Sequence, residues 1–217
     1  MNNNTDRLLV NERFVSIQGE STQAGRVCYF IRLAGCNLKC VWCDTAYALN
    51  GKPVEIEKLV ADTVLSGVKL VEITGGEPLA QSGTPELAEK LLASGCEVMV
   101  ETNGSFDISV LPANTRRIVD CKLPASGMEH CNLWNNYKHL TPLDEVKFVV
   151  GSAEDFHFAL DVVNRYGLAD ICPLLFSPVW NMVKFDELAR WMVETNAPGR
   201  MQIQLHKIIW GAEARGV

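Results

Sequence analysis

The sequence lacks the features that mark membrane, secreted and nucleic-acid-binding proteins. Its 217 residues contain no run approaching the ~20 apolar residues of a membrane-spanning helix. The polar start of the chain, Met1–Arg7, has no apolar segment of the kind found in signal peptides. The formal net charge is −6 and there is no basic run, which argues against a nucleic-acid-binding surface. We therefore expect a cytoplasmic protein, folded as a single domain over residues 1–217, that binds neither membranes nor nucleic acid.

The sequence also lacks a paired set of zinc-binding motifs. It has eight cysteines, but no second CxxC or CxxH pair accompanies the group at Cys36, Cys40 and Cys43. Without an export signal, the thiols are expected to be reduced rather than joined in disulfides. The remaining cysteines lie mostly in apolar runs, which favours a place in the core: Cys28, Cys96, Cys121, Cys131 and Cys172.

What the sequence does have is a group of closely spaced thiols, C-x3-C-x2-C, from Cys36 to Cys43. They follow an apolar run, Val27–Ala34, and Gly35 breaks that run just before the first thiol. Thiolate is a soft ligand that suits zinc or an iron–sulfur cluster. A structural zinc ion takes four protein ligands, and a [4Fe–4S] cube normally takes four thiolates. Three thiolates would leave one iron of a cube free to bind a small molecule, whereas a zinc-binding structural module remains the non-enzymatic alternative.

Hydrophobic periodicity predicts strands and helices in alternation. The predicted strands are Val27–Ala34, Val68–Thr74, Cys96–Glu101, Arg117–Cys121, Glu145–Val150, Asp170–Phe176 and Met201–His206. The predicted helices are Glu55–Leu65, Pro85–Ala93 with Thr84 as its cap, Ala153–Arg165 and Lys184–Thr195. A closed eight-unit barrel takes ~250 residues. We therefore expect an α/β fold: an open partial (β/α) barrel of about six parallel strands and fewer than six helices, preceded by an N-terminal extended arm, Leu8–Ile17.

Polar residues follow the predicted strands at their carboxyl ends. They are the cysteine loop, Gly75-Gly76-Glu77, Thr102-Asn103, Lys122 and Ser177. In a parallel barrel the carboxyl ends of the strands share one face, and that face carries the chemistry. These residues, dispersed in sequence, are therefore expected to converge in space.

The cysteine spacing resembles the signature of radical S-adenosylmethionine (SAM) enzymes. In that family, the amino and carboxylate groups of SAM bind the iron that has no protein ligand, and an electron from the cluster cleaves SAM to a 5′-deoxyadenosyl radical. The glycines of Gly75–Pro78 would let backbone groups approach the amino group of SAM, although ordinary turns use the same residues. Trp42 could shield the cluster, Asn103 could hydrogen-bond SAM and Lys122 could pair with its carboxylate. Packing, a turn and solvation, respectively, are the ordinary alternatives.

Other polar residues suit a heterocyclic substrate. Gln18 both donates and accepts hydrogen bonds and Glu20 accepts two, so together they could read the amide-and-amine edge of a pterin or purine. Arg32 is a lone cation in an apolar strand and needs a carboxylate partner, either a Glu of this chain or a substrate acid. Thr45 could offer a hydroxyl to a hard cation such as Mg2+. His206, at the end of the last predicted strand, could bond a substrate through a neutral imidazole.

Several segments together resemble the 7-carboxy-7-deazaguanine synthase family. They are Ser16–Glu20, Phe30–Arg32, Gly35–Thr45, Thr74–Pro78, Glu101–Gly104 and His206-Lys207. The resemblance implies conversion of 6-carboxy-5,6,7,8-tetrahydropterin to 7-carboxy-7-deazaguanine with loss of ammonia, for queuosine and other 7-deazapurines. In the implied mechanism, the deoxyadenosyl radical abstracts hydrogen from C6 of the pterin and the substrate radical rearranges with ring contraction. Hydrogen then returns from deoxyadenosine, so that SAM is regenerated.

The resemblance also implies ligands, partners and their residues. No side chain is implied as catalytic, because SAM supplies the radical. The cluster is assigned to Cys36, Cys40 and Cys43, and Mg2+ to Thr45. The residues implied to surround SAM are Trp42, Cys43, Asp44, Gly76, Glu77, Asn103, Asp120, Cys121, Lys122, Ser177, Pro178, Val179 and Trp180. Those implied to contact the substrate are Ile17, Gln18, Gly19, Glu20, Arg32, Thr74 and His206. A homodimer and an electron donor such as flavodoxin or ferredoxin are implied as partners.

Some positions depart from the family pattern. Ser21 stands where a glycine is usual, and Asp120-Cys121-Lys122 and Ser177-Pro178 differ from the usual forms. In some members the C-terminal carboxylate reaches the substrate, but the tail Trp210–Val217 is of a different type, which argues against that role for Val217. A second enzyme interpretation is an activase that makes a glycyl radical on a partner protein. It shares the three-cysteine loop and the small size, but it would not need the pterin-reading residues near the N-terminus.

Overall fold

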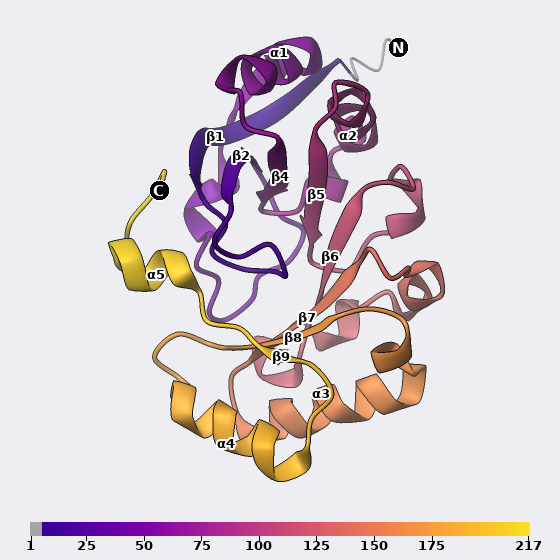
Figure 1. Ribbon diagram of the computed structural model, residues 1–217, viewed down its shortest axis with the longest axis vertical. Helices are drawn as coiled ribbons and strands as arrows, with labels where there is room; N and C mark the ends of the chain where they lie inside the picture. The colour runs from indigo at the N-terminus through magenta and orange to yellow at the C-terminus, as the bar shows by residue number, and fades with distance from the viewer. Residues whose placement is uncertain (1–5) are drawn as a thin grey trace.

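The computed structural model describes residues 6–217, in which nine strands form one sheet (Figure 1). Of the polar start predicted at Met1–Arg7, residues 1–5 lie outside the described part. The strands are β1 (Arg7–Ile17), β2 (Val27–Leu33), β3 (Lys52–Glu55), β4 (Leu70–Gly75), β5 (Glu97–Thr102), β6 (Arg116–Cys121), β7 (Glu145–Val150), β8 (Leu174–Pro178) and β9 (Arg200–Met201). Their order across the sheet is β3-β1-β2-β4-β5-β6-β7-β8-β9.

The parallel part of the sheet consists of β2 and the six strands from β4 to β9. β1 pairs antiparallel with both β2 and β3. Within residues 6–217 the outermost strands, β3 and β9, pair on one side only, so the sheet stays open. The predicted open partial barrel is thus confirmed. The predicted N-terminal arm, Leu8–Ile17, proves to be a full strand of the sheet, because its backbone pairs along β2 and β3.

Five α-helices occur in the described residues, in agreement with the expectation of fewer than six: α1 (Ile56–Ser66), α2 (Thr84–Ala93), α3 (Ala153–Tyr166), α4 (Phe185–Thr195) and α5 (Leu205–Trp210). Figure 1 shows α1 and α2 at one end of the molecule and α3 and α4 at the other, with α5 at the left margin. Leu59 of α1 belongs to one buried cluster with Ile73 of β4, and Phe156 of α3 belongs to another with Phe148 of β7. No helix in this part of the chain is long and apolar enough to cross a membrane.

The ends of α3 follow from its local sequence. The Ser152 hydroxyl accepts a hydrogen bond of 3.2 Å from the backbone N–H of Asp155, which caps the start of the helix. At the other end Gly167 adopts a left-handed φ of 61°, a conformation that glycine reaches at little cost. The buried residues recur at helical spacing, so one face of the helix packs on the sheet: Phe156, Ala159, Val162 and Val163.

Two predictions before the last predicted strand are wrong in detail. Thr84 is the first residue of α2 rather than its cap, and its hydroxyl donates to the carbonyl oxygen of Pro78 at 2.6 Å. The predicted strand Asp170–Phe176 begins four residues late, at Leu174, because Leu168–Asp170 forms a 3-10 turn that continues from the end of α3.

The prediction for the last strand is also wrong. Of Met201–His206, only Met201 remains in a strand, and α5 begins at Leu205. The backbone N–H of Leu205 donates to the carbonyl oxygen of Gly19 at 3.0 Å. This partner lies at the opposite end of the chain, so no local pattern reveals it. As a consequence His206 lies on a helix rather than at the end of a strand.

Candidate active site

A cavity of about 380 Å3 opens at the carboxyl ends of the parallel strands. It is lined by the cysteine loop, by the strand ends and by the C-terminal segment, so the predicted convergence of these loops is confirmed. The predicted site residues that line it are Ile17, Gln18, Gly19, Glu20, Arg32, Cys36, Cys40, Trp42, Cys43, Asp44, Thr45, Thr74, Gly76, Asn103, Asp120, Cys121, Lys122, Val179, Trp180 and His206. Glu77, Ser177 and Pro178 do not line it.

The cysteine loop is fixed by close backbone packing. Gly35 turns the chain at the end of β2, with a φ of 86°. The N–H of Glu77 donates to the carbonyl oxygen of Gly35 at 2.8 Å. A Cβ on Gly76 would lie only 1.9 Å from that same oxygen, so no larger residue fits. The close packing of the two loops is therefore enough to require a glycine at position 76. That the backbone of Gly76 also approaches SAM remains a prediction.

The Glu77 side chain supports the loops instead of facing the cavity. It is fully buried, and its carboxylate accepts hydrogen bonds from the Leu79 N–H (2.9 Å), the Thr102 hydroxyl (2.8 Å) and the Asn103 N–H (2.6 Å). Burial raises the pKa of Glu77, and these donors oppose the rise. The carboxylate therefore joins the end of β4 to the end of β5, and contact with a cofactor is not what this geometry favours.

The donors around the thiols suit iron–sulfur ligands. The Leu38 N–H lies 3.4 Å from Cys36 Sγ, and Asn103 Nδ2 lies 3.7 Å from the same sulfur. Cys43 Sγ lies 3.6 Å from the Thr45 hydroxyl. Hydrogen bonds to cysteine sulfur are among the contacts that tune such clusters. The loop thus offers three thiols, with polar neighbours at two of them.

The side chains do not converge as a zinc site requires. Among residues 6–217, no group of three or more His, Cys, Asp or Glu side chains is placed to hold one metal ion. A structural zinc ion needs all its ligands around a single point. In a cube each thiolate binds a different iron, so its ligands need not converge in this way. The arrangement of Cys36, Cys40 and Cys43 therefore fits a cluster better than zinc.

The end of β6 offers unused polar atoms for a cofactor. Asp120 Oδ2 pairs with Lys122 Nζ at 2.8 Å, while Asp120 Oδ1 is buried and has no hydrogen-bond partner among residues 6–217. An orphaned buried acceptor is costly, and a donor on a bound molecule would satisfy it. In the described part of the chain the Ser177 hydroxyl, on β8, is also buried and without a partner, although Ser177 does not line the cavity. Burial raises the pKa of Cys121 to about 12, so this thiol stays protonated at neutral pH.

Arg32 has the carboxylate partner that its burial requires. Its Nε donates to Glu12 Oε1 at 2.7 Å, and the Tyr47 hydroxyl donates to the same oxygen at 2.9 Å. Among residues 6–217, this is the only hydrogen bond of the Arg32 side chain. The partner is therefore a glutamate of this chain. Arg32 also lines the cavity, and its terminal nitrogens make no hydrogen bond within the described residues.

Gln18 and Glu20 are part of a buried network. Gln18 Nε2 donates to Glu72 Oε2, and Gln18 Oε1 accepts from the Glu20 N–H at 3.0 Å. The Glu20 carboxylate accepts from Gln202 at 3.0 Å and from Gln204 at 2.8 Å. The orientation of both predicted substrate-reading side chains is thus set by other side chains of the chain.

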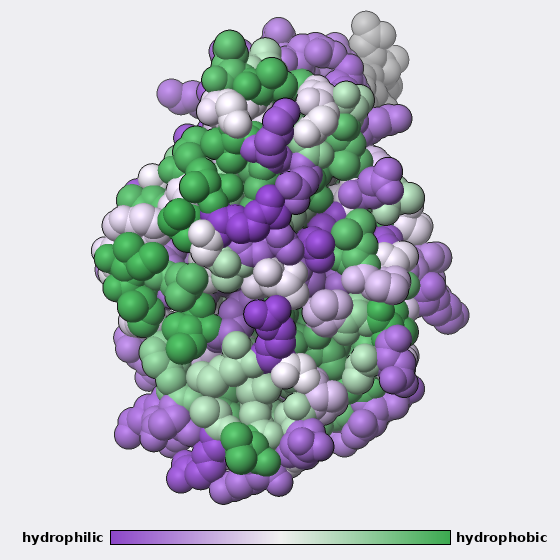
Figure 2. All heavy atoms as spheres, in the orientation of Figure 1, coloured by the Kyte–Doolittle hydropathy of each residue, from purple (hydrophilic) through white to green (hydrophobic). Residues whose placement is uncertain are grey.

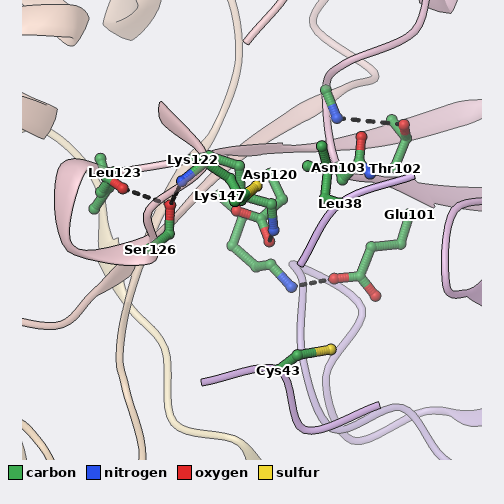
Figure 3. A network of polar contacts seen from close by, with 12 residues as sticks. Leu38, Cys43, Glu101, Thr102, Asn103, Asp120, Lys122, Leu123, Ser126 and Lys147 are labelled. Atoms are coloured by element: carbon green, nitrogen blue, oxygen red, sulfur yellow. Dashed lines mark hydrogen bonds and ion pairs between the residues drawn. The ribbon is translucent and has the colours of Figure 1, made fainter. Parts of the chain in front are cut away.

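Lys147 is the cation of this network. Its Nζ contacts Glu20 Oε2 at 3.2 Å. The same nitrogen pairs with Glu101, as Figure 3 shows. Although burial disfavours the Lys147 cation, the charges of Glu101 and Glu20 hold its pKa well above the usual value. Burial likewise opposes ionisation of Glu101, but the Lys147 cation lowers the pKa of that carboxyl. Both groups are therefore charged at neutral pH.

The C-terminal helix α5 closes one side of the cavity. Lys207 Nζ pairs with Asp44 Oδ2 at 2.7 Å and lies 5.9 Å from the Trp180 ring centroid. The His206 ring packs against Gly19, where a Cβ would lie 2.3 Å from His206 Nδ1. α5 thus contacts the cysteine loop and the predicted substrate loop at once.

Sequence reasoning missed several charged residues that line this cavity. They are Glu72, Glu101, Lys147 and Lys207. The first three are charges that follow apolar residues in β4, β5 and β7, which is the signal that singled out Arg32, although β5 and β7 each hold one more acid, Glu97 and Glu145. Applied to every strand, that signal would have found them. Lys207 gives no comparable signal, because it lies outside the predicted strands and helices.

Comparison with known proteins gives consistent results. Residues 30–122 match the family model for the radical SAM superfamily. The chain is 38% identical to 7-carboxy-7-deazaguanine synthase of Koribacter versatilis, covering 96% of this chain and 99% of that protein. It is 40% identical to the enzyme of that name from Chlorobaculum tepidum, covering 97% of each chain. The crystal structure of QueE from Escherichia coli is similar in fold, with a TM-score of 0.76 at 23% identity over 91% of this chain and 94% of that one. The chain belongs to the 7-carboxy-7-deazaguanine synthase family of the radical SAM superfamily.

Proposed function

We propose that this enzyme converts 6-carboxy-5,6,7,8-tetrahydropterin to 7-carboxy-7-deazaguanine with loss of ammonia. The observation that carries the proposal is one cavity lined both by the three-thiol loop and by Gln18, Glu20 and Arg32. When bound by Cys36, Cys40 and Cys43, a [4Fe–4S] cluster supplies, with SAM, the radical that starts the reaction. The chain itself binds and orients the pterin.

Different groups of the cavity suit different parts of the pterin. The terminal nitrogens of Arg32 form a planar fork that suits the pterin carboxylate. The carboxylates of Glu20 and Glu101, both paired with Lys147, suit the donors of the aminopyrimidine ring. The cysteine loop forms another wall of the cavity, where Asn103 contacts Cys36 and Thr45 contacts Cys43. These groups would hold the pterin between the sheet and the cofactor.

A Mg2+ ion is proposed to bind at Thr45. The support is its hydroxyl, which lines the cavity beside Cys43. Mg2+ takes few protein ligands and keeps several waters, so one hydroxyl and a substrate carboxylate would be a sufficient anchor. Assays with and without added Mg2+ on wild-type protein and on Thr45→Val test this. Equal Mg2+ stimulation of the two proteins would contradict the assignment.

A homodimer is proposed from an exposed apolar surface on α5. Ile208, Ile209 and Trp210 are 55%, 54% and 40% exposed, and Figure 2 shows hydrophobic side chains gathered at the left margin where Figure 1 places this helix. Exposed apolar groups of this kind mark interaction surfaces. Sedimentation of wild-type protein and of Ile209→Lys tests this: a dimer that becomes a monomer supports it, and two identical profiles refute it.

A flavodoxin or ferredoxin as electron donor is a further proposal, tested by reduction of the cluster with each.

The decisive experiment is a product assay. Anaerobically reconstituted protein is incubated with SAM, a reductant and the pterin, and the products are analysed by mass spectrometry. We expect 7-carboxy-7-deazaguanine from wild-type protein and from Cys131→Ser, a thiol outside the cavity. We expect no product and little bound iron from Cys40→Ser. A wild-type protein that holds iron but forms no deazapurine would refute the proposed reaction.

A further inference from the structure

Glu72 is a buried acid of the cavity with no function assigned so far. It lies in the middle of β4, where Glu72 pairs in register with Phe30 of β2 and Met99 of β5. Side chains alternate along a strand, so Glu72 shares the cavity face with Thr74, while Val71 and Ile73 enter the core on the other face. Glu72 is 4% exposed. A carboxyl at this depth must be paired, hydrogen-bonded or neutral.

The partners of Glu72 differ from those of its neighbours. Three carboxyls lie together here, on Glu20, Glu72 and Glu101. Lys147 pairs with Glu20 and Glu101. Among residues 6–217, Glu72 forms no ion pair, and its side-chain partner is the neutral amide of Gln18. Within the described residues Lys147 therefore pairs with two of the three carboxyls, whereas the Glu72 side chain is hydrogen-bonded only to the Gln18 amide.

Ionisation of Glu72 is unfavourable in these surroundings. Burial raises the pKa of Glu72 well above its usual value, and the charges of Glu101 and Glu20 raise it further, whereas the hydrogen bond from Gln18 and the Lys147 cation lower it without cancelling the rise. The titratable or polar groups that face Glu72 are Gln18 and Glu20 after β1, Cys28 and Arg32 on β2, Glu101 on β5 and Lys147 on β7. The neutral acid is thus the form that the surroundings select.

The hydrogen bond to Gln18 links Glu72 to substrate binding. The Gln18 oxygen faces the Glu20 N–H, so its nitrogen must face Glu72. If the amide turned over, its NH2 group would face the Glu20 N–H donor, and the Glu72 oxygen would lose the donor that it now accepts from. Gln18 is 2% exposed and lines the cavity, so its orientation determines which hydrogen bonds a ring edge finds there.

We propose that Glu72 is a positioning residue that works as a neutral carboxylic acid: it fixes the amide of Gln18 and keeps a third negative charge away from the pterin site. The inference rests on the proposed function for the identity of the ligand. Loss of the Glu72 proton adds a negative charge beside the bound ring. Affinity for a 6-carboxypterin therefore falls at alkaline pH.

Binding affinity measures this effect directly. Reconstituted holoenzyme is titrated calorimetrically with 6-carboxypterin from about pH 6 to about pH 9.5, a range that includes the pKa values of about 8–9 known for buried Glu. The variants are Glu72→Gln, which mimics the neutral acid, and Glu12→Gln, which removes an ion-paired carboxylate next to the same cavity. Ionisation of the probe itself is common to all proteins and cancels in the ratio of dissociation constants.

We expect Glu72→Gln to bind within about threefold of wild type at neutral pH, where both side chains are neutral. In the alkaline range the ratio of wild-type to variant dissociation constants should rise by up to about tenfold per pH unit, because one proton is linked to binding. For Glu12→Gln the ratio should not change with pH. A flat ratio for Glu72→Gln would overturn the proposal.

A second measurement does not depend on ligand binding or on the variant. The infrared spectrum of wild-type holoenzyme at neutral pH should contain a protonated-carboxyl band from Glu72 that disappears at alkaline pH. Absence of any alkaline-titrating carboxyl band overturns the proposal even if Glu72→Gln does not fold. Failure of the product assay with an intact pH effect would instead leave Glu72 as a positioning residue and refute the proposed reaction.

Discussion

Single residues of this enzyme show why buried charges and the active site coincide. Arg32 illustrates the point, because its side chain is 15% exposed and its partner Glu12 is 22% exposed. An ion pair at this depth contributes through the cost of leaving one partner alone rather than through its own attraction. The Arg32 cation that stabilises the fold through Glu12 is also the group proposed to bind the substrate carboxylate.

Arg32→Met should therefore reduce both stability and binding. We expect a loss of about 2–4 kcal/mol in the free energy of unfolding, because Glu12 loses its cation. The matched control is Arg7→Met, whose ion pair with Glu55 is 49% and 60% exposed and should cost less than about 1 kcal/mol. Urea unfolding of the two variants measures the difference. Equal losses would show that the Arg32 pair is as weak as a surface pair.

At the scale of elements, the backbones of β2 and β4 lie in close contact where the two strands end. Gly75 ends β4 with a φ of 138°, and a Cβ there would lie 2.1 Å from the carbonyl oxygen of Leu33. The ends of these two strands place the cysteine loop next to Gly76. Backbone contact, rather than side-chain packing, thus determines the position of the thiols.

Gly75→Ala should consequently unfold the junction. We expect a loss of more than about 4 kcal/mol, or no soluble protein, because both the left-handed backbone and the contact with Leu33 are violated. Gly95→Ala is the matched control: Gly95 has a φ of 78° with nothing within 4 Å of its Cβ position, so only the conformational cost of about 1–2 kcal/mol applies. Thermal unfolding of both variants, with iron content, tests this. A stable Gly75→Ala variant with a full cluster is the contrary result.

The pair of Lys147 on β7 and Glu101 on β5 spans the intervening strand β6. The lowered pKa of Glu101 means that its contribution is present above the unfolded value of about 4.3 and is lost as the pH falls further. The raised pKa of Lys147 means that its contribution is present below the unfolded value of about 10.4 and is lost as the pH rises through the folded value. The pair therefore stabilises the sheet between these two limits.

Lys147→Met should lose about 3–5 kcal/mol at neutral pH, since it leaves the partly buried Glu101 without its cation. The difference from wild type should shrink as the pH falls, first because Glu101 of the variant, without its cation, takes up a proton, and then because Glu101 of wild type is protonated as well. Lys90→Met, which breaks exposed pairs with Glu57 and Glu86, is the control and should stay within about 1 kcal/mol. Urea unfolding at several pH values is the measurement. A difference that does not change with pH would contradict the argument.

For the whole molecule, the cavity unites the two ends of the chain. Its lining runs from Phe14 to Val217, and the loop after β1 is tied to the other half of the sheet. The Thr22 N–H donates to Glu145 of β7 at 3.0 Å, and the Ser21 N–H donates to Gln202 at 2.6 Å. Within the described residues, both halves of the sheet thus contribute to one site.

Ligand binding should therefore stabilise the entire chain. At a pterin concentration 100 times its dissociation constant, we expect about 2.7 kcal/mol of added stability. The unfolding transition should shift as one unit, as the predicted single domain requires. Anaerobic urea unfolding with and without 6-carboxypterin, followed by fluorescence and by far-UV circular dichroism, tests this. A shift of only part of the transition would indicate two independently folding units.

The sequence by itself determined the alternation of strands and helices and the three-thiol loop, because these depend on local spacing. Glu145–Val150 was predicted with the bounds that the structure gives to β7. Arg32 was recognised as a cation that needs a carboxylate, since its burial follows from the strand pattern alone. Which carboxylate pairs with Arg32 depends on the side chains that the fold places next to it.

Only the tertiary structure decided those neighbours. Strand pairing brings Glu101, 27 residues from Thr74, within 3.3 Å of its hydroxyl, and a backbone bond to Gly19 starts α5 where a strand was predicted. Charges on different strands perturb one another only after the sheet has formed. The proton on Glu72 and the orientation of Gln18 are therefore properties of the assembled sheet, and no single segment of sequence contains them.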